Sequence, residues 1–102
     1  MLPYDFDWII DDQVGAMSLP EPEDLDRLRE SGVTLLVSLL HHVPPAEEVR
    51  RAGMRLVRLP IHDFSAPSEE QIRDFVAEVR AELHRGGKVA VHCVGGLGRT
   101  GR

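Results

Sequence analysis

The strongest constraint on the fold is an amphipathic helix between two continuous apolar runs. Ser68 can cap this helix, with Gln71 completing a capping box, and Gly86 follows its last turn. Residues 33–39 and 88–92 are short apolar runs typical of strands buried on both faces. This alternation predicts an α/β fold with a mainly parallel sheet and flanking helices. The apolar stripe of the helix consists of Ile72, Phe75, Val76, Val79 and Leu83.

Shorter segments extend the pattern on both sides. The sequence predicts strands at residues 8–10, 14–17 and 54–60 and helices at residues 20–29 and 45–51. Gly32 and Gly53 follow the two helices, as expected of residues that end a helix. Arg55 and Arg58 favour a less central place in the sheet for the strand that carries them.

The composition predicts one globular domain over residues 1–102. Hydrophobic residues make up 42% and charged residues 28%, which excludes a disordered chain. A net charge of -5 argues against nucleic acid or an acidic membrane as the main partner. One cysteine cannot form an internal disulfide, and no apolar run is long enough to cross a bilayer. We therefore expect a cytoplasmic protein without nucleic-acid or membrane partners.

The run at residues 88–92 leads into a glycine-rich segment that contains the only cysteine. Four of the nine glycines lie in the last eight residues, and such a segment can turn its backbone N–H groups toward an anion. Residues 96–101 match the dinucleotide pattern G-x-G-x-x-G, but the chain ends before the acidic residue which that site needs. A buried structural cysteine would explain Cys93 but not Arg99.

A third interpretation is cysteine-dependent phosphoryl transfer. Cys93 and Arg99 bracket five residues, enough for a loop around a tetrahedral phosphate. The thiolate would lie beneath the phosphorus and the guanidinium would bind two oxygens. Loop amides and a helix N-terminus would lower the pKa of the thiol, and the hydroxyl of Thr100 could donate to the departing thiolate. The residues of the loop are Val94, Gly95, Gly96, Leu97 and Gly98.

Residues 92–101 resemble the signature of the protein tyrosine phosphatase superfamily, His-Cys-x-x-Gly-x-x-Arg-Thr/Ser-Gly. They match it at every fixed position. Residues 5–8, 37–39 and 59–67 also resemble the small atypical dual-specificity phosphatases, and the compact, single-domain dual-specificity phosphatase 23 type is most similar. The resemblance implies a cysteine-phosphatase fold that covers essentially the whole chain.

The resemblance also implies a general acid at Asp63. This aspartate follows the predicted strand at residues 54–60, as Cys93 follows the one at residues 88–92, and the carboxyl ends of parallel strands share one edge of a sheet. Cys93 would attack phosphorus while Asp63 protonates the leaving oxygen. Arg99 and the amides of residues 94–99 would hold the phosphate, and His92 would orient the loop. No metal or cofactor is required, and His41-His42 is interpreted as a loop pair.

The loop also bears on the substrate. None of its variable residues is Lys or Arg, which disfavours an inositol phospholipid, and the acidic net charge disfavours an RNA 5′-phosphate. A short chain predicts a shallow site. We expect phosphorylated proteins or small aryl phosphates as substrates, with phosphotyrosine as the default and phosphoserine or phosphothreonine as further candidates.

The family pattern breaks at Arg102. The helix opened by the signature would have about one turn, which is unstable alone. We therefore expect an incomplete catalytic domain that lacks the C-terminal helices and is poorly stable and weakly active by itself. The alternatives are a catalytically weak phosphate-binding domain and a nucleotide-binding module.

Overall fold

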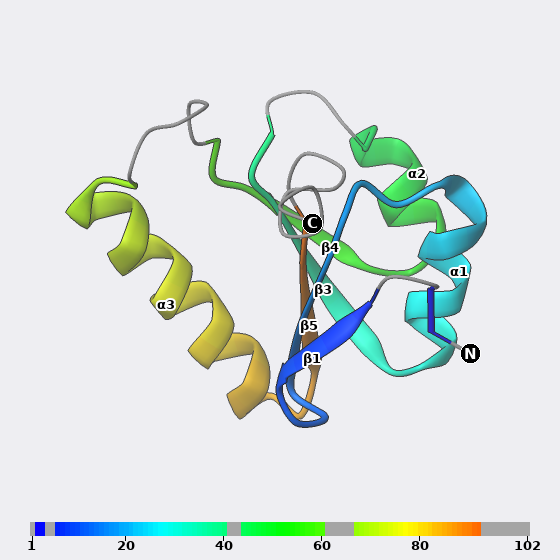
Figure 1. The fold of residues 1–102 in the computed structure, drawn as a ribbon, viewed down its shortest axis with the longest axis horizontal. Coiled ribbons are helices and arrows are strands. Elements are labelled where there is room, and N and C mark those ends of the chain that lie inside the picture. Colours follow the sequence, from blue (N-terminus) through cyan, green and yellow to red (C-terminus); the bar gives the residue numbers. More distant parts are fainter. Residues whose placement is uncertain (1, 4–5, 41–43, 61–66, 93–102) are drawn as a thin grey trace, which may run out of the picture.

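The computed structural model describes residues 2–3, 6–40, 44–60 and 67–92 (Figure 1). Strands and helices alternate along most of this length, which confirms the predicted α/β class. The order is β1 (Asp7–Ile10), β2 (Val14–Met17), α1 (Pro22–Glu30), β3 (Val33–Ser38), α2 (Ala46–Arg51), β4 (Arg55–Arg58), α3 (Glu69–His84) and β5 (Lys88–His92).

The five strands form one mainly parallel sheet in the order β1-β2-β5-β3-β4. β2, β5, β3 and β4 run parallel, and only β1 pairs antiparallel to its neighbour β2. β4 lies at one end of the sheet, as Arg55 and Arg58 predicted. The carboxyl ends of the four parallel strands therefore share one border, called the carboxyl edge below.

Helices cover both faces of the sheet. Figure 1 shows α1 and α2 on one face and α3 on the other. Side chains of β3 face both sides of the sheet: Val33 and Leu36 pack with Leu28 of α1, while Leu35 and Val37 belong to the cluster beneath α3. Strict alternation holds from Leu35 onward, because the register of β3 with β5 shifts between Val33 and Leu35. A strand that is buried on both sides needs apolar residues at successive positions, which explains the continuous apolar run in its sequence.

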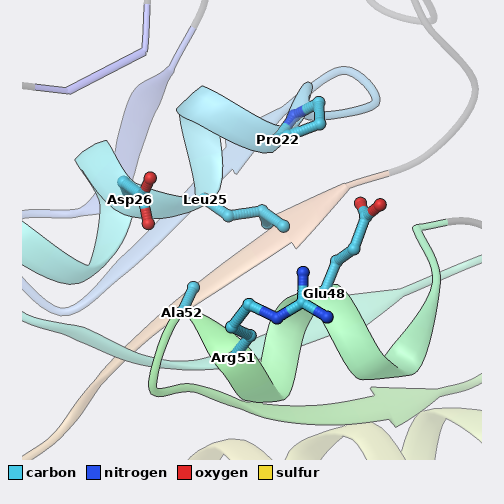
Figure 2. Close-up of a pocket in the computed structure, with 6 residues that line it drawn as sticks. All are labelled: Pro22, Leu25, Asp26, Glu48, Arg51 and Ala52. Atoms are coloured by element: carbon cyan, nitrogen blue, oxygen red, sulfur yellow. The ribbon is translucent and has the colours of Figure 1, made fainter.

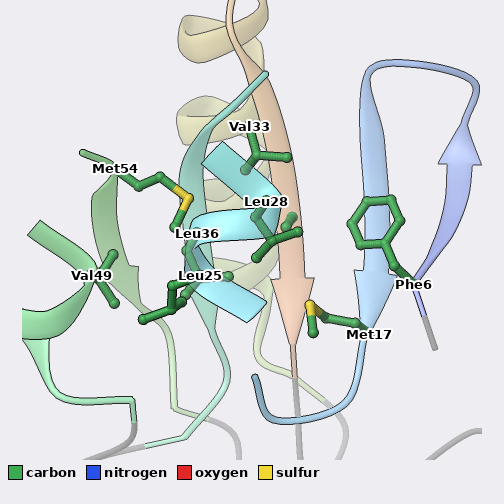
Figure 3. Packing of buried hydrophobic residues seen from close by; sticks show 9 residues of the cluster. Phe6, Met17, Leu25, Leu28, Val33, Leu36, Val49 and Met54 are labelled. Carbon is green, nitrogen blue, oxygen red and sulfur yellow. The ribbon is translucent and has the colours of Figure 1, made fainter. Parts of the chain in front are cut away.

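The larger of the two clusters fills the space between the sheet and the first two helices (Figure 3). Leu25 and Leu28 of α1 and Val49 of α2 extend into the cluster, and Phe6 and Met17 lie at its side near β2. Leu28 and Val49 are completely buried, and each such side chain contributes about 1.5–3 kcal/mol of transfer free energy. This packing holds the central strands in place.

The apolar stripe of α3 is only partly buried. Val79 is buried and Phe75 packs beside it, but Ile72 is 48% and Val76 41% exposed. Figure 1 shows that α3 lies near the sheet at its carboxyl end and stands away from it at its start. The first turns of the helix therefore leave their apolar side chains accessible.

Candidate functional site at the carboxyl edge

β5 delivers the chain to the centre of the carboxyl edge. Its last residue, His92, pairs with Met17 of β2 on one side and Ser38 of β3 on the other. The side chain of His92 is completely buried, and its carbonyl accepts a hydrogen bond of 3.1 Å from the amide of Leu39. Cys93, the predicted nucleophile, is the next residue in the sequence, so it directly follows a completely buried residue of the sheet.

Most of the predicted site lies outside the described residues. This applies to Asp63, Cys93, Arg99 and Thr100, to the histidine pair, and to the loop residues Val94, Gly95, Gly96, Leu97 and Gly98. His92 is the predicted site residue that the described ranges include. What the structure does describe is the point at which each site segment leaves the scaffold.

β4, the strand that precedes Asp63 in the sequence, ends at the same edge. The amide of Leu59 donates to the carbonyl of Ser38 at 2.8 Å, so the pairing of β4 with β3 extends one residue past the strand. Pro60 follows, three positions before Asp63. β3 alone separates β4 from β5 in the sheet. Because neighbouring strands are about 4.8 Å apart, the ends of β4 and β5 lie about 10 Å from each other.

The end of β3 lies between these two departure points. Ser38 is completely buried, and its hydroxyl bonds with the backbone of Leu40, accepting from the amide at 3.2 Å and donating to the carbonyl at 3.3 Å. A serine that bonds to the backbone two residues later makes a local turn. The chain therefore turns sharply after β3 at the middle of the carboxyl edge.

Gln71 connects α3 with the end of β4, a contact that sequence reasoning missed. The predicted capping box is present: the Gln71 amide donates to the Ser68 hydroxyl and the Ser68 amide donates to Oε1 of Gln71, both at 3.0 Å. In addition, Nε2 of Gln71 donates to the carbonyl of Pro60 at 2.5 Å. The sequence held one signal of this contact: glutamate would also complete the capping box, so the glutamine has an amide donor that the cap does not use.

A small apolar hollow of about 170 Å³ lies between the start of α3 and the sheet. Gln71 is the polar residue among its described lining residues, and Val91, two positions before Cys93, lies at its base. The full lining consists of Leu39, Leu59, Pro67, Gln71, Ile72, Phe75 and Val91. The hollow thus lies between the start of α3 and the strands that lead toward the predicted site.

A second hollow, of about 190 Å³, lies between α1 and α2 (Figure 2). Asp26 of α1 and Glu48 and Arg51 of α2 provide its charged groups, and Leu25 points into its apolar side. Its described lining residues come from α1, α2 and the residue after α2, and none belongs to β4 or β5, the strands that lead toward the predicted phosphate site.

The charge cluster around Glu82 lies at the opposite, amino end of the parallel strands. Burial alone would raise the pKa of Glu82, but hydrogen bonds from Thr34, Arg55 and Arg85 outweigh it and hold the pKa below its usual value. The Thr34 hydroxyl donates at 2.6 Å and Arg55 donates at 2.8 Å. This cluster joins α3 to β3 and β4, so its role is structural.

Comparison with known proteins identifies the family. A model of the family described as Tc-R-P, polymorphic toxin system, DSP-PTPase phosphatase matches residues 12–102. The chain belongs to this family. The tyrosine-protein phosphatase CDC14 of Candida albicans is 32% identical over 85% of this chain and 16% of its own length. The human dual specificity protein phosphatase CDC14A is 30% identical over 95% of this chain and 18% of its own length.

Solved structures of phosphatases share the fold of this DSP-PTPase domain. Tk-PTP in its active form is 32% identical, with a TM-score of 0.76 over 91% of this chain and 65% of that chain. The structure of a DUF442 protein from Shewanella putrefaciens CN-32 has a TM-score of 0.74 at 24% identity over 87% of this chain and 58% of that chain, which shows the fold alone. The chain spans less than a fifth of the length of the curated CDC14 relatives. In the described ranges, each helix is too short or too polar to cross a membrane.

Proposed function

We propose that this DSP-PTPase domain is a cysteine-dependent phosphatase that hydrolyses phosphotyrosine monoesters through a phosphocysteine intermediate. The observation that carries the proposal is the arrangement of β4, β3 and β5. It directs the segments that carry Asp63 and Cys93 away from one edge of the sheet, one strand apart. An acid and a nucleophile must meet at one phosphate, and two strands that end at one edge with a single strand between them support such a meeting.

In the first step, the Cys93 thiolate attacks phosphorus and forms a sulfur–phosphorus bond. The bond from phosphorus to the leaving oxygen breaks, and Asp63 gives its proton to that oxygen. In the second step, Asp63 accepts a proton from water as the water oxygen attacks phosphorus, and the sulfur–phosphorus bond breaks to restore the thiolate. Arg99 and the amides of residues 94–99 hold the three non-bridging oxygens in both steps.

His92 and Thr100 support the nucleophile in this scheme. His92 is buried in the centre of the sheet, so it can hold the start of the Cys93 loop at a fixed place. Thr100 donates to the thiolate when it departs. Residues 5–8, 37–39 and 59–67 resemble the small atypical dual-specificity phosphatases, and this resemblance supports phosphoserine, phosphothreonine and small aryl phosphates as further substrates.

Replacement of the nucleophile tests the proposal. We expect Cys93→Ser to abolish vanadate-sensitive hydrolysis of an aryl phosphate, and a brief acid-quenched reaction with a labelled substrate to label the unmodified chain but not the variant. Alkylation of Cys93 by iodoacetate should be fast at neutral pH and slowed by inorganic phosphate, because the site stabilises the thiolate. Hydrolysis that survives Cys93→Ser would contradict the mechanism. Phosphate protection without phosphocysteine formation would instead support a phosphate-binding domain without catalysis.

A further inference from the structure

One side chain joins both ends of the segment that carries Asp63. Residues 61–67 connect Pro60, at the end of β4, with Ser68, at the start of α3. Gln71 bonds to both: its Nε2 donates to the carbonyl of Pro60 and its Oε1 accepts from the amide of Ser68. A single planar amide therefore ties the beginning of this segment to its end.

The chemistry of the contact requires glutamine. A capping box needs only an acceptor at this position, so glutamate would cap α3 equally well. The bond to Pro60 needs a donor, because proline offers a carbonyl and no N–H at that point. Of the two residues that complete a capping box, only glutamine supplies both groups. The second bond is therefore a separate feature of this chain and adds nothing to the cap.

We propose that Gln71 is a positioning residue for Asp63. It holds Pro60 and Ser68 at a fixed separation beside the carboxyl edge, so that the segment between them starts and ends at defined places. This inference rests on the proposed function, in which Asp63 protonates the leaving oxygen. Proton transfer requires the acid within hydrogen-bond reach of that oxygen, and a displacement of about 1 Å can cost about 100-fold in rate.

Two variants separate the bond to Pro60 from the helix cap. Gln71→Glu keeps the acceptor for the Ser68 amide but loses the donor to Pro60 and places a carboxylate oxygen against the carbonyl. Ser68→Ala is the matched control, because it removes the hydroxyl that caps α3 and keeps both bonds of the Gln71 side chain. Thermal unfolding of the control should show a lower Tm, which verifies that the cap has been lost.

The kinetic test compares two leaving groups. Phenol, with a pKa of about 10 like tyrosine, needs a proton as it departs, whereas the more acidic nitrophenol needs little help. We expect Gln71→Glu to lower kcat for phenyl phosphate about 10-fold more than kcat for nitrophenyl phosphate, with KM nearly unchanged. Ser68→Ala should not change the ratio of the two rates. An unchanged ratio in Gln71→Glu would overturn the proposal.

Asp63→Asn distinguishes failure of this inference from failure of the proposed function. If Asp63 is the acid, Asp63→Asn reduces phenyl phosphate turnover selectively, and Gln71→Glu adds nothing further to the selectivity in that background. If Asp63→Asn has no selective effect, the proposed function is wrong. If Asp63→Asn is selective and Gln71→Glu acts equally in both backgrounds, Gln71 does not act through Asp63.

Hydrogen exchange provides a readout that needs no turnover. The amide of Leu59, next to Pro60, donates to the carbonyl of Ser38 and should be protected. We expect Gln71→Glu to accelerate exchange at Leu59 several-fold and Ser68→Ala to leave it unchanged. Equal exchange rates at Leu59 in the unmodified chain and both variants would show that Gln71 does not restrain Pro60, and would overturn the proposal even in an inactive protein.

Discussion

His92 is the last described residue of β5 and the residue before the proposed nucleophile. It is completely buried between Met17 and Ser38, in the centre of a four-stranded parallel set. A residue fixed on both sides gives the loop that follows a rigid starting point, and a phosphate loop depends on such rigidity because its amides must already point at the anion. Gln71 does the same at the other departure point, through its bond to Pro60.

Arg99 is the residue at which side-chain geometry should matter most. Arginine binds two phosphate oxygens with a planar fork, whereas lysine presents a single ammonium. We expect Arg99→Lys to weaken inhibition by vanadate and to lower kcat/KM by about 10- to 100-fold, as for the loss of one charged hydrogen bond. The same change at Arg73, an exposed residue of α3, is the control and should leave both values unchanged. Equal vanadate inhibition in both variants would refute a bidentate role for Arg99.

At the scale of elements, local sequence signals locate the helices and strands, and packing determines which of their side chains are buried. The strands and helices lie close to where hydrophobic patterning and glycines placed them, and Gly32, Gly53 and Gly86 have positive φ just after α1, α2 and α3. Patterning did not determine the burial of Ile72 and Val76, because a helical stripe indicates which face is apolar but not how closely the sheet approaches it. The tilt of α3 away from the sheet decided their exposure.

β2 contains a glycine that the local pattern does not explain. Phe6 packs over Gly15 and meets Trp8 edge to face, with ring centroids 4.9 Å apart. A Cβ at Gly15 would overlap the Phe6 ring. We expect Gly15→Ala to lower the free energy of unfolding by about 1–3 kcal/mol in denaturant titrations, since overpacking displaces the ring.

A double-mutant cycle provides the check on Gly15. In a Phe6→Leu background the Gly15→Ala change should cost less, because the side chain that it meets is smaller and can move aside. An equal cost in both backgrounds would show that the ring is not the cause.

At the scale of the whole molecule, the two ends of the parallel strands differ in what they carry. The carboxyl edge carries the departure points toward Asp63 and Cys93, while the amino end carries the cluster around Glu82. Glu82 bonds Thr34 of β3 and Arg55 of β4 from its place on α3, which joins three elements that are distant in the sequence. Such a cluster can hold the layers together without entering the site.

Glu82 should also give the molecule a defined response to acid. Its pKa is lowered in the folded state, so its contribution to stability is complete above the unfolded value near 4.5 and disappears as the pH falls through the lower folded value. We expect Glu82→Gln to reduce the free energy of unfolding by about 2 kcal/mol at pH 7. The loss is no larger because solvent screens the charges of the half-exposed Arg55 and Arg85. Denaturant titrations from pH 7 to pH 3 should show the gap between the two proteins closing in acid.

Glu78 provides the matched control one turn earlier on α3. Its side chain is 40% exposed and lies 3.7 Å from Arg55, so Glu78→Gln should change the free energy of unfolding little. A gap between the Glu82→Gln variant and the unmodified chain that stays constant down to pH 3 would contradict the role assigned to the charge of Glu82.

The sequence alone predicted the α/β class, the parallel sheet and the candidate residues, because hydrophobic period, helix caps and the spacing from Cys93 to Arg99 are local properties. It also placed Arg55 and Arg58 on an outer strand, since charged residues avoid a position with neighbours on both sides. Tertiary structure decided the order of the strands, and with it that β3 separates the segments leading to Asp63 and Cys93. It also decided that Gln71 meets Pro60, because hydrogen bonds between elements depend on how a helix is laid against a sheet, which no local pattern specifies.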